Sequence, residues 1–129
     1  MMKRKGLYLF ALVFMVFIGG VFMVLIKNSP LDIKTFDVSE YQYYINNYSS
    51  EESLGFISDE KDLLKKVEVI WIKKYGERIK NEKPYQVFYD EENGIWLVQG
   101  TLRSNMMGGV ANILVENDTG KVLAVWHDK

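Results

Sequence analysis

The segment SDEKDLLKKVEVIWIKKYG, residues 58–76, decides the fold class of this chain. Its large apolar side chains recur every three or four positions, which is the spacing of a helix that buries one face. We expect this helix to cover about residues 59–75, with Ser58 as its N-cap and Gly76 as its stop. The apolar stripe consists of Leu63, Leu64, Val67, Ile70, Trp71 and Tyr75. Such a stripe needs a second layer of structure to cover it.

Four segments that are rich in β-branched and aromatic residues follow the helix, as strands require. They are PYQVFYD (84–90), IWLVQGTL (95–102), GVANILVE (109–116) and KVLAVWH (121–127). The first and last connections between them, DEENG and NDTG, are polar and contain glycine, which is typical of antiparallel hairpins. We therefore predict an α+β domain in which one main helix packs on a four-stranded antiparallel meander. The second face of the sheet is left for solvent, a ligand or a partner.

The N-terminal part of the chain has the pattern of a membrane anchor. Residues 6–26, GLYLFALVFMVFIGGVFMVLI, carry no charge and follow Lys3, Arg4 and Lys5. A helix of this length spans about 30 Å, the thickness of the hydrocarbon core of a bilayer. The basic flank predicts a single-pass cell-membrane protein with residues 1–5 in the cytoplasm and the C-terminal domain outside it. A cleaved signal peptide is the alternative, but no A-x-A site follows the apolar run.

Charge is divided unevenly along the chain. Three of the 16 basic residues precede the apolar run, so residues 27–129 hold 13 basic and 17 acidic residues, a net charge of −4. An acidic exterior makes nucleic acid a poor partner. The chain has no cysteine, which rules out disulfides, thiolate nucleophiles and cysteine-ligated zinc. We interpret the polar and tyrosine-rich residues 27–54 as a linker between the anchor and the domain.

Residue types that carry enzymatic or metal chemistry are scarce. The single histidine, His127, would need a partner such as Ser104 with Asp128 to form a hydrolytic triad, but no G-x-S-x-G motif frames the serine. The carboxylates of DEEN (90–93) lack the spacing of a calcium loop, and GTLRSNMMGG (100–109) matches no phosphate-binding motif. We therefore predict no catalytic, cofactor-binding or metal-binding residues, and interpret His127 as the residue of a frayed strand end.

A set of short motifs is spread over residues 55–129. They are Ile70-Trp71 with Tyr75-Gly76, Lys83-Pro84-Tyr85, WLVQGTL (96–102), Gly108-Gly109-Val110, and TGKVL (119–123) with the terminal HDK. In this order they resemble the immunity proteins with a nuclear transport factor 2-like fold, which belong to bacterial polymorphic toxin systems. Arg103 stands where that family has proline, and HDK replaces HGK. The resemblance implies a cystatin-like immunity domain over residues 55–129, which is not an enzyme and which binds and neutralises a cognate toxin protein.

The loop after the GTL motif holds our candidates for contact with the toxin. They are Arg103, Ser104, Asn105, Met106 and Met107. Methionine side chains adapt to irregular partner surfaces, and adjacent methionines are unusual at a loop tip. In the alternative interpretation, one methionine packs under the edge of the sheet.

Two other functions stay open from the residues alone. The first is a small-ligand-binding or enzymatic domain of the same fold superfamily, with an apolar cavity between the helix and the sheet. Trp71, Trp96 and Trp126 would line such a cavity, although core packing is the default for buried tryptophan. The second is an envelope-associated interaction or sensory module without a toxin partner.

Overall fold

The computed structural model describes residues 32–104 and 107–129. The predicted anchor at residues 6–26 and two of the candidate loop residues, Asn105 and Met106, lie outside the described residues. Within the described part of the chain, no helix has both the length and the apolar character that crossing a membrane requires.

The centre of the fold is a five-stranded sheet in the order β1-β2-β3-β4-β5. Its strands are β1 (Ile33–Thr35), β2 (Gln86–Asp90), β3 (Ile95–Gln99), β4 (Ala111–Glu116) and β5 (Val122–His127). Strands β2 to β5 form the predicted antiparallel meander, with Val87 opposite Val98 and Val98 opposite Ile113. The predicted number of four strands is wrong, because β1 pairs in parallel with the outer edge of β2. A three-residue strand is too short to show any alternation in the sequence.

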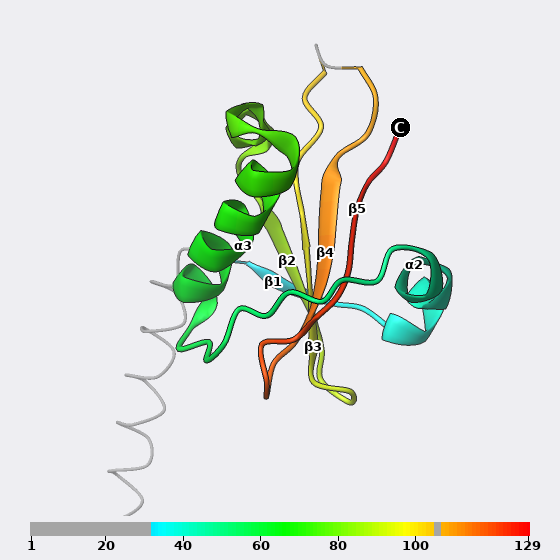
Figure 1. Cartoon of the computed structure of the whole chain (residues 1–129). Coiled ribbons are helices and arrows are strands. Elements are labelled where there is room, and N and C mark those ends of the chain that lie inside the picture. Colours follow the sequence, from blue (N-terminus) through cyan, green and yellow to red (C-terminus); the bar gives the residue numbers. More distant parts are fainter. Residues whose placement is uncertain (1–31, 105–106) are drawn as a thin grey trace, which may run out of the picture. The chain divides into compact units, whose positions relative to one another are not determined.

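Helix α3 (Glu60–Tyr75) lies on one face of this sheet (Figure 1). Its N-cap is Asp59 rather than Ser58, because the Asp59 carboxylate accepts the Asp62 amide at 2.8 Å. The Ser58 amide instead donates to the Asp62 carboxylate at 3.0 Å. The helix ends at Gly76 as predicted, and the 3-10 helix η2 (Glu77–Glu82) follows directly. The side chains that α3 buries against the sheet are Leu63, Val67, Ile70 and Trp71.

The opposite face of the sheet is also covered, contrary to our expectation. The 3-10 helix η1 (Val38–Tyr41) and helix α2 (Gln42–Asn47) pack there (Figure 1). The ring of Tyr44 stacks on Trp126 with 4.2 Å between ring centroids. The physical reason lies in the inner strands, since Leu97 and Leu114 are fully buried on the face away from α3. Those side chains need an apolar cover that the segment before α3 supplies.

The segment between α2 and α3 runs along β5. The amides of Val122 and Val125 donate to the carbonyls of Glu52 and Tyr48, each at 3.0 Å, and the Leu54 amide donates to Gly120. This segment satisfies donors that an edge strand would otherwise expose, as β1 does along β2. Much of the region that we interpreted as a linker therefore packs on the sheet as β1, η1, α2 and the segment that follows them.

Candidate functional site

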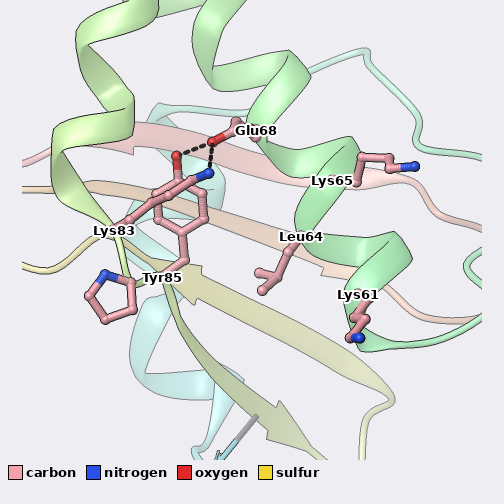
Figure 2. A pocket seen from close by; sticks show the side chains of 7 residues that line it. Lys61, Leu64, Lys65, Glu68, Lys83 and Tyr85 are labelled. Carbon is pink, nitrogen blue, oxygen red and sulfur yellow. Dashed lines mark hydrogen bonds and ion pairs between the residues drawn. The ribbon is translucent and has the colours of Figure 1, made fainter. Parts of the chain in front are cut away.

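A groove of about 400 Å³ opens between helix α3 and the start of β2 (Figure 2). We call it the α3–β2 groove. Its lining residues are Lys61, Leu64, Lys65, Glu68, Lys83, Pro84 and Tyr85. The apolar side chains form its floor, and the lysines stand along its rim. The lining thus holds three lysines and one carboxylate, of which only Lys83 pairs with Glu68, in a domain whose overall charge is negative.

Glu68 organises one end of the α3–β2 groove. Its carboxylate accepts the Tyr85 hydroxyl at 2.7 Å and the Lys83 ammonium at 3.1 Å, as Figure 2 shows. Burial opposes ionisation of Glu68, but the hydrogen bonds from Tyr85 and Lys83 lower its pKa below the ordinary value. Burial and the same bond to Glu68 raise the pKa of Tyr85 above its usual range. Glu68 is thus held as a carboxylate and Tyr85 as a neutral phenol at neutral pH.

The loop between β3 and β4 begins beside this groove. The guanidinium of Arg103 donates to the Lys83 carbonyl at 3.0 Å, and the Thr101 hydroxyl donates to the Pro84 carbonyl. The Thr101 amide also donates to the Glu82 carbonyl at 2.7 Å. These bonds tie the GTL motif to the KPY motif, so that the groove and the loop form adjoining parts of one surface.

The structure describes three of the five candidate loop residues, Arg103, Ser104 and Met107. Arg103 is exposed but turned back onto Lys83, and Ser104 is exposed in a turn. Met107 is 95% exposed, so this residue does not pack under the sheet edge. Leu102, which we did not select, is 48% exposed and adds apolar area at the same loop. Nothing is described for the remaining two candidates.

A buried carboxylate lies at the base of this loop. Glu82, at the end of η2, accepts the Ala111 amide through Oε1 at 2.8 Å, and its Oε2 lies 2.8 Å from Nε2 of His127. His127 is therefore a paired residue of the fold rather than a frayed strand end. Gly100 accommodates this carboxylate, because a Cβ at that position would lie 2.2 Å from Oε1 of Glu82.

Sequence reasoning did not find the Glu82–His127 pair or the α3–β2 groove. The members of each come from elements far apart in the chain, 45 residues in the case of Glu82 and His127. The family motifs carried the only available signal, since KPY supplies Lys83, Pro84 and Tyr85 of the groove, and the terminal HDK supplies His127.

The pair does not form a recognisable catalytic centre. A hollow of about 140 Å³ beside it is lined by Tyr75, Arg78, Ile79, Asn81, Glu82, Met107, Gly109 and His127, none of them a serine, threonine or cysteine nucleophile. Among the described residues, no three side chains of the histidine, cysteine, aspartate or glutamate type gather as a metal site would require. The tryptophans pack in the two apolar clusters, Trp71 and Trp96 on the α3 side and Trp126 on the other.

Comparison with known families identifies the class of the protein. A family model described as NTF2 fold immunity protein matches residues 65–129, which is half of the chain. The match runs from the middle of α3 to the C-terminus and includes strands β2 to β5, the groove residues from Lys65 onward and the whole β3–β4 loop. The chain therefore belongs to the NTF2 fold immunity protein family. No curated protein and no solved structure matched the chain.

Membership of this family defines the kind of function. Immunity proteins bind cognate toxins and neutralise them, and they are not enzymes. The chemistry that matters in this chain is thus that of a protein–protein interface: exposed apolar side chains, charge and shape.

Proposed function

We propose that this chain is a membrane-anchored immunity protein that neutralises its cognate toxin at the outer face of the cell membrane. The observation that carries the proposal is the charge-free run at residues 6–26 behind Lys3, Arg4 and Lys5. A basic flank keeps the short N-terminus in the cytoplasm and places the folded domain on the other side. A domain held there meets a toxin as the toxin arrives at the membrane or crosses it.

We further propose that the β3–β4 loop, with Arg103, Ser104, Asn105, Met106 and Met107, contacts the toxin. The exposure of Met107 and Leu102 supports this, because apolar side chains that are exposed on the same loop offer a partner apolar surface to bury. Methionine fits such a role because its side chain adapts to the partner surface.

The location is tested with a C-terminal epitope tag on the full chain. Protease added to intact spheroplasts should remove the tag, and the protein should remain in the membrane fraction after washing with high salt. A tag that is cleaved only after the cells are lysed would overturn the orientation, and release by salt would overturn the anchor.

The loop is tested by its affinity for a candidate toxin domain, which we would seek in the genes next to that of this chain. The variants Arg103→Glu and Met107→Ala should each weaken binding, and Met106→Ala should be compared with them. Both Arg103→Glu and Arg103→Gln remove the guanidinium that donates to the Lys83 carbonyl, but only Arg103→Glu reverses the charge. Comparison of the two variants therefore separates the loss of this hydrogen bond from the effect of charge reversal. Unchanged affinity in all of these variants, with unfolding by urea also unchanged, would remove the loop from the interface.

A further inference from the structure

We propose that the α3–β2 groove receives an acidic segment of the toxin, with carboxylates on Lys61 and Lys65 and an apolar side chain on the floor of the groove. This inference rests on the proposed function and names the chemistry of the partner at one surface.

The rim of the groove carries positive charge that is not neutralised within the domain. Lys83 is paired with Glu68, but Lys61 and Lys65 form no ion pair with any residue of the described ranges. Both are exposed and lie one turn apart on the same side of α3 (Figure 2). Like charges one turn apart on a helix surface disfavour each other slightly, and carboxylates of a partner placed between them would reverse this effect.

The floor of the groove suits a protein side chain. Leu64 is half-buried against the core, Tyr85 is buried, and the Tyr85 ring packs edge-on against Trp71 with 5.0 Å between centroids. The hydrogen bonds of Glu68 with Tyr85 and Lys83 fix the positions of these side chains at one end of the groove. An apolar floor with charged groups at its rim suits an apolar anchor side chain of a partner that has charged residues next to it.

The surrounding charge distinguishes an acidic protein segment from nucleic acid. Residues 27–129 carry a net charge of −4, so a long polyanion would be repelled by most of the domain. A short acidic segment of a folded toxin needs only the local field of Lys61 and Lys65. The position of the groove agrees with this, because Arg103 links its Lys83 end to the loop that we propose as a toxin contact.

The test is zero-length cross-linking of the full chain, held in zwitterionic detergent, with the same candidate toxin domain. A carbodiimide joins lysine amines to carboxylates that are already paired with them, and mass spectrometry locates the products. The cross-link between Lys83 and Glu68 serves as an internal control. We expect additional cross-links from Lys61 or Lys65 to aspartate or glutamate of the toxin.

The same complex is then measured by titration calorimetry. The double variant that combines Lys61→Glu and Lys65→Glu should weaken toxin binding by about tenfold or more at low salt, and by less at high salt. The matched control is Lys74→Glu with Lys121→Glu, which changes the net charge equally at exposed positions outside the groove and should weaken binding by less than about threefold. Urea unfolding of both double variants shows that the fold is intact.

The outcomes separate the two proposals. Tight binding of the unchanged chain, with no cross-link from Lys61 or Lys65 and equal effects of the two double variants, would overturn the groove and leave the immunity function standing. Binding of a DNA duplex at physiological salt that depends on Lys61 and Lys65 would also overturn it. No binding of the toxin by the folded chain would overturn both this inference and the choice of that toxin as the cognate partner.

Discussion

The carboxylate of Glu82 lies where four parts of the chain meet. It accepts the Ala111 amide at the start of β4, and it faces His127 at the end of β5. The backbone carbonyl of Glu82 accepts a hydrogen bond from the Thr101 amide. The backbone of Gly100 lies so close to the Glu82 side chain that no Cβ would fit between them. Residues of the GTL and HDK motifs thus surround one buried acid, so these motifs hold the base of the β3–β4 loop.

The first prediction is that Glu82→Ala lowers the free energy of unfolding by about 2 kcal/mol, because the buried Ala111 amide loses its acceptor. Glu82→Gln should cost less, since the amide oxygen still accepts from Ala111. Urea unfolding measures both, and His127→Ala, which removes a half-exposed partner, is the comparison. An alanine variant as stable as the parent protein would show that water satisfies this amide.

The second prediction concerns Gly100. A Cβ there would lie 2.2 Å from Oε1 and 2.8 Å from Cβ of Glu82, so Gly100→Ala should lower the free energy of unfolding by about 1–3 kcal/mol. Because Glu82→Ala removes the closer of these contacts, the double variant should lose less stability than the sum of the two single variants. Strictly additive losses would mean that Gly100 is needed for another reason.

At the scale of elements, Asp90 connects the end of β2 to the segment on the second face. Its Oδ2 accepts the Val38 amide of η1 at 2.8 Å, and Oδ1 accepts the Asn93 amide at 3.0 Å. Hydrogen bonds from Val38 and Asn93 hold the pKa of Asp90 below its ordinary value of 3.8. The folded protein therefore binds this proton less readily than the unfolded chain does.

The third prediction follows from the sign of that shift. A depressed pKa in the folded state contributes stability above the ordinary value of 3.8, and this contribution is lost as the pH falls through the lower pKa of the folded state. The Asp90→Ala variant should have a lower urea midpoint at neutral pH and should lose less stability between about pH 5 and pH 3 than the parent protein. Glu91→Ala, exposed in the same turn, is the control. Parallel pH profiles for the parent and Asp90→Ala would contradict the assignment.

The fourth prediction concerns the domain boundary. A fragment of residues 31–129 should fold, whereas a fragment of residues 55–129 should aggregate, because it exposes Leu97, Leu114 and Trp126 and leaves the β5 edge unpaired. Gel filtration and heteronuclear NMR spectra measure this directly. A monomeric 55–129 fragment with dispersed amide signals would show that β1, η1 and α2 are dispensable.

The same elements show how much of this fold was predictable. Helix α3 and strands β2 to β5 are visible in the sequence because their periodicity is local, from Leu63 to Trp71 and from Val87 to Trp126. Strand β1 and the contact of Tyr44 with Trp126 are not visible in the sequence. A three-residue strand is defined only by its pairing with β2, and Tyr44 covers the sheet only once β5 has placed Trp126. The α3–β2 groove is hidden for a related reason. Lys61 and Lys83 lie 22 positions apart and meet only when α3 packs beside β2.

At the scale of the whole molecule, charge is sorted by position. The three basic residues at positions 3–5 precede the apolar run, the remainder of the chain is acidic, and within it the α3–β2 groove is locally positive. An acidic domain remains soluble and avoids nonspecific binding to anionic lipids and nucleic acid, while the groove keeps a local site for a carboxylate partner.

The last prediction tests the compartment with three versions of the protein: the full chain, residues 31–129 behind a cleaved export signal, and residues 31–129 without a signal. Cells that carry each version are challenged by neighbours that deliver the toxin, and survival is counted. The full chain should protect best, because anchoring raises the concentration of the domain at the surface where the toxin arrives. The exported fragment should protect only at high expression, and the fragment without a signal should not protect. Equal protection by that last version would place neutralisation inside the cell, and the hydrophobic run at residues 6–26 would then need another explanation.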